Sequence, residues 1–228
     1  MELGYWGIKG VAEPIRWLIA YLGLEVKEYN PASAEEWFGQ KKSSLGLEYP
    51  NLPYLIDGDF KLTESTAIPY YLANKAGRAD LFGKDLKEQV LHKEIEGVLN
   101  DLRSNLNKAI FHHEKHLEQF KRFVDLGAPS SAKLEMLSKF LGEKEFFLGH
   151  LTWVDFLFAY LGEFYNVTST SLGTEHASRH DNLRALVKRV HELPGIKERV
   201  AASQNVPFMP PQMLKFHLMT TAEADAKH

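Results

Sequence analysis

Short apolar segments in the N-terminal third of the chain predict strands on either side of one amphipathic helix. Residues 3–6 are mostly apolar, and apolar and polar positions alternate over residues 24–29, as in a half-buried strand. Between them, apolar residues recur at helical spacing over residues 15–22. Pro14 suits the first turn of this helix, and Gly23 suits its end. The predicted order is strand, helix, strand.

A β-hairpin is predicted after a polar, irregular stretch at residues 31–46, in which we expect Trp37 and Phe38 to be exposed. The apolar run of residues 54–56 is followed by an Asp-Gly turn and by a second alternating segment. Pro53 opens the hairpin at a point where a strand can spare one backbone donor. Because it precedes a strand, Pro53 is also a candidate for a cis peptide bond.

A helix is expected to begin at Ser65, because apolar residues at helical spacing follow it over residues 67–72. Ser65 would then cap the helix, and the free N–H groups behind it form a ready site for an anion. Pro69 lies inside this helix and lacks a backbone donor, so we expect a strained first turn or a shifted start. We therefore expect the loop before Pro53, the start of the hairpin and the N-terminus of this helix to lie close together in the fold.

Beyond a linker at residues 74–84, the pattern changes to long helices. Thr152 and Asp155 are spaced as a capping box at the start of one of them. A short helix follows Pro194-Gly195, and the end of the proline-containing tail is expected to fray. Apolar residues keep helical spacing in four segments: residues 91–110, 134–141, 153–160 and 182–190.

This order predicts an α/β N-terminal domain, residues 1–78, an all-α C-terminal domain, residues 85–205, and a tail, residues 206–228. The length of 228 residues allows one large or two small domains. Hydrophobic residues make up 44% and charged residues 25%, so the chain can bury a core and stay soluble.

Charge and cysteine content narrow the classes of function. The net charge is −3 and no block of like charge occurs, so nucleic acid and anionic membranes are poor candidate partners. No apolar run is long enough to span a bilayer, and the N-terminus lacks the pattern of a signal peptide. The absence of cysteine excludes disulfides, thiolate catalysis by the protein and zinc–thiolate sites. It fits a reducing compartment, and we expect the protein to be cytoplasmic.

Four motifs resemble those of the cytosolic glutathione transferases: Gly4-Tyr5-Trp6 and residues 51–58, 64–68 and 152–155. The eight-residue string Asn-Leu-Pro-Tyr-Leu-Ile-Asp-Gly is most similar to the mu class. The resemblance runs from about residue 2 to about residue 211, and it implies a thioredoxin-like N-terminal domain. Thioredoxins carry a redox Cys-x-x-Cys after the first strand, where this chain has Tyr-Trp-Gly-Ile. The resemblance therefore implies that glutathione supplies the thiol as a co-substrate, with no cofactor or metal.

By this resemblance, Tyr5 matches the catalytic tyrosine of the family. A free cysteine thiol has a pKa of about 8.5, so little of it is thiolate at neutral pH. A phenol that donates a hydrogen bond to the sulfur favours the thiolate, and a drop of roughly two pKa units would leave the bound thiol mostly ionised. The alternative is that Tyr5 is an ordinary strand aromatic.

The resemblance also implies a contact for each end of glutathione. The cysteinyl backbone would pair with the main chain of Leu52, and the γ-glutamyl carboxylate would bind Ser65. The α-amino group would bind Glu64 and the partner subunit's Asp101. Trp37 and either Lys41 or Lys42 would bind the glycyl carboxylate. The full set expected to contact glutathione is Tyr5, Trp6, Val11, Trp37, Lys41, Asn51, Leu52, Glu64, Ser65 and Asp101. The alternatives are a plain helix cap for Ser65 and a solvated helix face for Asp101.

The second substrate is expected to be a small hydrophobic electrophile, because the residues expected to line its pocket are largely apolar. They are Tyr5, Trp6, Ile8, Val11, Phe111 and Leu214.

Several positions depart from the family pattern. Ala34 replaces an arginine, Glu64 replaces a glutamine, and one residue is inserted between Trp37 and Gly46. Phe111 replaces a tyrosine, which removes a hydroxyl donor to the electrophile and weakens the case for activation of epoxides or enones.

Two further features remain. An aromatic residue at the position of Tyr49 inserts into the partner subunit in this family, which implies a homodimer; the alternative is an ordinary packed aromatic.

His112 and His116 are spaced to share a metal, but no carboxylate completes a site, so a solvated helix face is the favoured interpretation.

Three functions are compatible with this fold: an enzyme that conjugates glutathione to electrophiles, a ligandin-like carrier, and a crystallin-like structural protein. The presence of Tyr5 together with the whole ligand loop favours the enzyme, because neither carriage nor bulk packing needs a phenol directed at a thiol.

Overall fold

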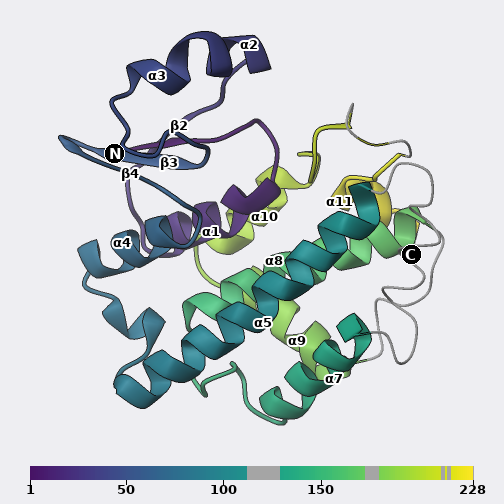
Figure 1. The fold of residues 1–228 in the computed structure, drawn as a ribbon. Helices are drawn as coiled ribbons and strands as arrows, with labels where there is room; N and C mark the ends of the chain where they lie inside the picture. The colour runs from purple at the N-terminus through teal and green to yellow at the C-terminus, as the bar shows by residue number, and fades with distance from the viewer. Residues whose placement is uncertain (112–128, 173–179, 212–213, 215–216, 228) are drawn as a thin grey trace.

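The computed structural model describes residues 1–111, 129–172, 180–211, 214 and 217–227 (Figure 1). Its N-terminal part contains a four-stranded sheet in the order β2-β1-β3-β4. The central strand β1 (Glu2–Gly4) pairs in parallel with β2 (Lys27–Tyr29) and antiparallel with β3 (Tyr54–Asp57). The edge strand β4 (Phe60–Thr63) completes the predicted hairpin with β3.

Two helices, α1 (Glu13–Tyr21) and α4 (Ala67–Lys75), pack on each other beneath the sheet. Figure 1 shows both on the side of the sheet that faces the helical part of the molecule. Pro14 lies in the first turn of α1 as predicted, where its missing N–H has no partner to lose. A 3₁₀ turn, η1 (Gly10–Ala12), precedes α1 and carries the chain from the end of β1 to the helix.

The rest of the described chain is helical, which confirms the predicted fold class. A connection with a short 3₁₀ turn, η3 (Ala79–Phe82), leads into the longest helix, α5 (Leu86–Phe111). The further helices are α7 (Pro129–Leu141), α8 (Trp153–Ser171), α9 (Asp181–His191) and α10 (Ile196–Ser203). Among the described residues, no helix has the length and apolar character needed to cross a membrane.

One hydrophobic core runs through both parts. It joins residues of the sheet and of α1 to residues of α5, α8 and α9. The ring of Trp17 meets the ring of Tyr160 at 6.3 Å, and the ring of Tyr21 meets that of Phe156 at 5.6 Å. These edge-on aromatic contacts join α1 to α8 and favour a fixed relation between the two parts.

The predicted capping box at the start of α8 is present and buried. Asp155 Oδ2 accepts from both the N–H and the hydroxyl of Thr152, each at 2.8 Å. Asp155 Oδ1 accepts from the N–H of Phe147 at 2.9 Å. Both Thr152 and Asp155 are fully shielded from solvent, so these bonds satisfy groups that water cannot reach.

The stretch at residues 31–46 is not irregular, and the expectation that Trp37 is exposed was wrong. It contains three short helical turns: α2 (Ala34–Glu36), η2 (Trp37–Lys41) and α3 (Lys42–Ser44). Trp37 is 2% exposed and stacks on Tyr54 at 6.1 Å, in a small second core with Leu47. Phe38 is exposed as predicted. The packing of Trp37 on Tyr54 and Leu47 therefore buries this side chain, although the sequence around it is polar.

The helix α4 starts later than Ser65, so the expectation that Ser65 caps it was wrong. The residue before the helix is Thr66, and the carbonyl of Glu64 accepts from the N–H groups of Ala67 and Ile68. This start puts Pro69 in the first turn, where its missing donor is harmless. A shifted start, one of the two outcomes expected from Pro69, is therefore what the structure shows. Glu64, which precedes the helix, has a φ of 78°, in the left-handed region.

The described part of the tail does not fray. A short helix, α11 (Thr221–Asp225), begins with a capping box between Thr220 and Glu223. Met219 and Ala224 are buried in the main core. The signal for this helix, a threonine three residues before a glutamate, is present in the sequence, although the expectation of a frayed tail did not use it.

We predict that Asp155→Asn lowers the free energy of unfolding by about 1–3 kcal/mol, because an amide nitrogen would face donors in a buried site. Urea unfolding measures the loss. The matched control is Asp181→Asn, in the exposed first turn of α9, which should change stability by no more than about 0.5 kcal/mol. Equal effects of the two substitutions would contradict a structural role for the buried cap.

Candidate active site

Tyr5 directly follows β1 and is held at both its backbone and its side chain. Its N–H donates to the carbonyl of Tyr29 at 3.0 Å, and its carbonyl accepts from the side chain of Asn30 at 2.8 Å. Its side chain is 8% exposed. The hydroxyl oxygen accepts from the N–H of Val11 at 3.3 Å. Because the oxygen is the acceptor in this bond, the hydroxyl hydrogen stays available for another partner.

The electrostatic surroundings of Tyr5 act in opposite directions. Burial raises the pKa of Tyr5 above its usual value, while the Val11 N–H and the positive charges of Arg16 and Arg103 lower it. The net pKa is raised, so the phenol keeps its proton at neutral pH. Tyr5 is therefore a hydrogen-bond donor at this pH and not a base.

Gly10 lies directly against the Tyr5 ring. Its φ of +44° belongs to the left-handed region, which side chains disfavour. A Cβ atom added at Gly10 would lie 2.5 Å from the Tyr5 hydroxyl oxygen. The position therefore needs glycine for two reasons, its backbone conformation and the space that Tyr5 occupies.

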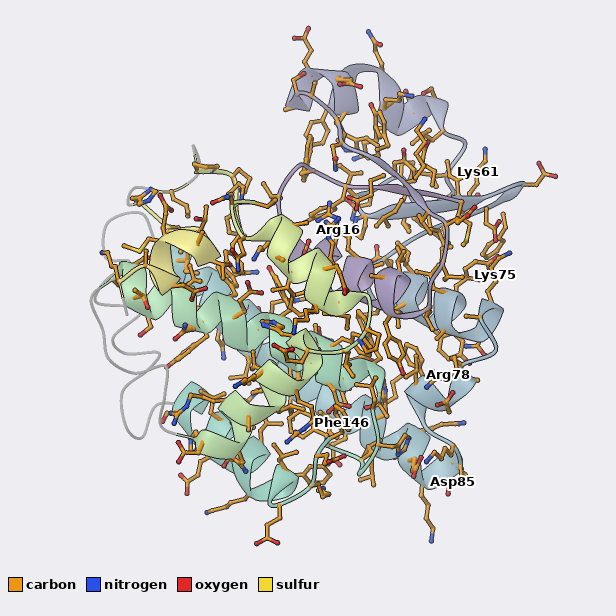
Figure 2. All side chains as sticks on the ribbon, turned by 180° about the vertical axis from the view of Figure 1, so that it is seen from behind. Arg16, Lys61, Lys75, Arg78, Asp85 and Phe146 are labelled. Atoms are coloured by element: carbon orange, nitrogen blue, oxygen red, sulfur yellow. The ribbon has the colours of Figure 1, made fainter. Side chains whose placement is uncertain are left out.

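Arg16, from α1, fixes the loop after Tyr5. Its guanidinium donates to the carbonyls of Trp6, Ile8 and Lys9 at 3.3, 2.8 and 3.4 Å. It also pairs with the carboxylates of Glu13 and Glu28, at 3.2 and 2.8 Å. Figure 2 shows Arg16 where the sheet part meets α10. Sequence reasoning missed this residue, because an arginine in an amphipathic helix is usually solvated.

The start of the hairpin offers backbone groups beside this loop. The Leu52–Pro53 peptide bond is cis, as the sequence suggested. The β1–β3 ladder ends at the pair of Gly4 and Tyr54, so the backbone of Leu52 lies beyond it. Leu52 packs on the core around Trp37, whereas Asn51 is exposed.

A small pocket joins Ser65 and Val11, two of the predicted contact residues. It lies between the start of α4, the loop before α1 and the helix α5. Three polar residues of α5 also line it: Glu96, Asn100 and Arg103. Among the described residues, Glu96 Oε1 and Asn100 Oδ1 are buried without a hydrogen-bond partner. Sequence reasoning missed all three, because their helical spacing resembles that of a solvated face.

Arg103 brings positive charge to this pocket. Burial lowers its pKa, while Tyr160, Tyr5 and Glu96 raise it. The positive charge of Arg103 therefore lowers the pKa of Tyr5, although the two residues come from different parts of the chain.

The predicted contact residues around Trp37 lie in the loop after β1 and on the helical turns η2 and α3. Trp6 packs against Phe38 with ring centroids 6.5 Å apart. The Lys41 amine lies 4.9 Å from the centre of the Tyr29 ring, and the Lys42 amine lies 5.5 Å from the centre of the Phe38 ring. Both lysines are half-buried, so the choice between Lys41 and Lys42 stays open.

The remaining predicted residues are more scattered. Glu64 and Asp101 are exposed, and Asp101 pairs with Lys133 of α7. Ile8 is half-buried, and Leu214 packs on the main core. Phe111 ends α5, but its side chain lies outside the described part of the chain, as do His112 and His116. Within the described ranges, no group of three histidine or carboxylate side chains could hold a metal.

Comparisons with known proteins point to one family. A model described as "Glutathione S-transferase, N-terminal domain" matches residues 1–74, and a C-terminal domain model of the same family matches residues 131–190. Glutathione S-transferase B of Cavia porcellus is 34% identical over 215 residues, which cover 91% of this chain and 94% of that protein. Glutathione S-transferase Mu 2 of Homo sapiens is 39% identical over 165 residues, 69% of this chain and 72% of that protein.

The fold agrees with these matches. The crystal structure of the glutathione S-transferase Blo t 8 superposes with a TM-score of 0.78 at 29% identity, covering 95% of this chain and 99% of that one. The similarity therefore extends over the sheet, the helical part and their junction.

We predict that Gly10→Ala lowers the free energy of unfolding by about 1–3 kcal/mol and displaces the Tyr5 hydroxyl from the Val11 N–H. Urea unfolding and a crystal structure of the variant measure these effects. Gly7→Ala is the matched control, because Gly7 is exposed and a Cβ added there meets nothing within 4 Å. A Gly10→Ala protein as stable as the Gly7→Ala protein would show that the space beside Tyr5 is not constrained.

Proposed function

The chain belongs to the glutathione S-transferase family, and we propose that it joins the thiolate of glutathione to small hydrophobic electrophiles. In this reaction the sulfur attacks an electrophilic carbon and a sulfur–carbon bond forms. Where the electrophile carries a leaving group, that group departs with its bonding electrons. The thiol proton passes to solvent. Glutathione is the co-substrate, and no bound cofactor takes part.

The observation that carries this proposal is the environment of the Tyr5 hydroxyl. The hydroxyl is shielded from solvent, it stays protonated at neutral pH, and its oxygen accepts the Val11 N–H. Accepting this bond polarises the O–H group and strengthens its donation to an anion. A thiolate placed before Tyr5 would receive that donation, which lowers the pKa of the thiol.

The other contacts with glutathione follow from the resemblance and are part of the proposal. The γ-glutamyl carboxylate binds Ser65, and the cysteinyl backbone pairs with Leu52 beyond the end of the β1–β3 ladder. The remaining glutathione contacts that we propose are Trp6, Val11, Trp37, Lys41 or Lys42, Asn51, Glu64 and the partner subunit's Asp101.

For the electrophile we propose an apolar pocket over the Tyr5 hydroxyl, formed by the loop after β1, the end of α5 and the tail. Its residues are Ile8, Val11, Phe111 and Leu214. We also propose that residues 1–78 act as the glutathione-binding domain, residues 85–205 as the helical domain, and residues 206–228 as a tail. The cysteine-free sequence needs no oxidising compartment, in keeping with action in the cytoplasm.

The direct test is a spectroscopic assay with a chloronitrobenzene electrophile, with and without glutathione. The proposal expects glutathione-dependent product at micromolar enzyme. A protein that binds glutathione and hydrophobic dyes but forms no product would favour the ligandin-like carrier instead.

We predict that Tyr5→Phe lowers turnover by about 10-fold to 1,000-fold, equivalent to about 1.4–4 kcal/mol of barrier. The phenyl ring preserves the packing but cannot donate to the sulfur. Steady-state kinetics measure turnover, and calorimetry checks that glutathione still binds. If affinity falls in step with turnover, Tyr5 has a structural role and no catalytic one.

Assembly as a homodimer is a further part of the proposal. Tyr49 is 76% exposed on the segment that leads to Asn51 and Leu52, and large exposed aromatics are typical interface anchors. A partner subunit that covers Tyr49 would also fix the segment that binds glutathione.

We predict that Tyr49→Ala shifts the protein toward the monomer and weakens glutathione binding, because the contact segment loses its anchor. Asp101→Asn should weaken binding and leave the dimer intact. Analytical ultracentrifugation beside glutathione titration separates the two effects. A Tyr49→Ala protein that stays dimeric with unchanged affinity would exclude this coupling.

A further inference from the structure

Lys9 is a charged side chain that the catalytic proposal does not use. It lies four residues after Tyr5 and is 1% exposed. Its amine donates to Glu163 Oε1 of α8 at 2.6 Å and to the hydroxyl of Thr221 at 2.7 Å. It also lies 4.4 Å from the centre of the Phe208 ring. A buried ammonium is tolerated only with such close partners.

Thr221 closes this cluster from the tail. Its hydroxyl accepts from Lys9 and donates to Glu163 Oε1 at 2.7 Å. Thr221 begins α11, which packs on α8 (Figure 1). All three residues are buried, so each hydrogen bond replaces one that water cannot supply. The cluster of Lys9, Glu163 and Thr221 therefore ties the tail to the loop after Tyr5.

Backbone hydrogen bonds also connect the tail to the loop after Tyr5. The N–H of Lys9 donates to the carbonyl of Pro207 at 2.8 Å, and the N–H of Gly10 donates to the carbonyl of Phe208 at 3.0 Å. The next residue, Val11, carries the N–H that donates to the Tyr5 hydroxyl. A short path thus runs from the tail through Lys9 and Gly10 to Tyr5.

The charged groups around this path come from several helices. Arg16 donates to the Lys9 carbonyl, and Arg103 acts on Tyr5 from α5. The second oxygen of Glu163 lies 3.9 Å from His191 Nε2 of α9. His191 is also influenced by the charge of Asp225 in α11. Removing the Thr221 hydroxyl changes none of these charges. A substitution there therefore tests whether the position of Lys9 matters, without altering the charges around Tyr5.

We propose that Lys9 and Thr221 are positioning residues for Tyr5: the tail hydroxyl fixes Lys9, and Lys9 fixes the Val11 N–H that polarises the Tyr5 phenol. This inference rests on the proposed glutathione chemistry. The matched family models end at residue 190, so the tail contribution is made by residues beyond them. Loss of the anchor lets the loop shift, weakens the Val11 hydrogen bond and leaves Tyr5 a poorer donor to sulfur.

The experiment compares Thr221→Val, which is nearly isosteric but lacks the hydroxyl, with Thr221→Ser, which keeps it. Thr221→Ala is a second variant without the hydroxyl, in case the valine is not accommodated. Thr220→Val is the matched control, because it removes the cap of α11 and leaves the contacts of Lys9 in place. The readout is the pH dependence of kcat/KM for the electrophile at saturating glutathione, with thermal unfolding measured in parallel.

For Thr221→Val and Thr221→Ala, the apparent pKa of the bound thiol should rise by about half a unit to one unit. Below that pKa, kcat/KM should fall about threefold to tenfold, and at high pH it should approach the wild-type value. Thr221→Ser and Thr220→Val should keep the wild-type pH profile, even if Thr220→Val melts at a lower temperature.

Two outcomes would overturn the inference. In one, the variants without the hydroxyl melt earlier but keep the wild-type pH profile, which would give Thr221 a purely structural role. In the other, Thr220→Val shifts the profile as much as Thr221→Val, which would assign the effect to general loosening of the tail. An inactive wild-type protein would instead refute the proposed function, so the two failures are distinguishable.

Discussion

The site depends first on the buried guanidinium of Arg16. It donates hydrogen bonds to the carbonyls of Trp6, Ile8 and Lys9. It also forms ion pairs with the carboxylates of Glu13 and Glu28. These carbonyls point inward as the chain turns from β1 to α1, and without a donor each would be costly to bury. One planar group with several fixed donors can satisfy them together, which a lysine could not do. Removing it would leave the buried carboxylate of Glu13 with less compensation, a loss on the order of 3–5 kcal/mol.

With the loop fixed in this way, Tyr5 is constrained from three sides. Its backbone is tied to the region around β2, the lack of a side chain at Gly10 leaves room for its hydroxyl, and the Val11 N–H orients the oxygen. The tail adds a further constraint through Lys9. The proposed catalytic group therefore lies where the sheet, α1 and the tail meet.

The sequence was sufficient for the fold class, the hairpin, the cis proline and the capped start of α8, because each has a local signal. The proline before the strand and the Thr-x-x-Asp spacing are read without knowledge of distant contacts. Features that depend on tertiary packing were missed or misjudged. Trp37 is buried by Tyr54, and the tail helix is held by the main core.

The same distinction applies to the site. The motifs predicted Tyr5, Leu52 and Ser65 as site residues, whereas Arg16, Arg103 and Lys9 were not predicted. Arg16 and Arg103 lie on helices where the sequence looks like a solvated face, and Lys9 lies in the loop after β1. Only the fold shows that these cations are buried or half-buried. The partners that justify such a charge, Glu28 for Arg16 and Glu163 for Lys9, are distant in sequence, so no local pattern could reveal them.

The central claim is that the Tyr5 hydroxyl stabilises the thiolate of bound glutathione. Ultraviolet difference titration of glutathione bound to the wild-type protein and to the Tyr5→Phe protein tests it most directly, because it needs no electrophile. In the wild-type complex we expect a thiol pKa roughly two units below the free value of about 8.5, and in the variant a value close to the free one. A wild-type complex that titrates like free glutathione, or a variant that titrates like the wild type, would contradict the claim.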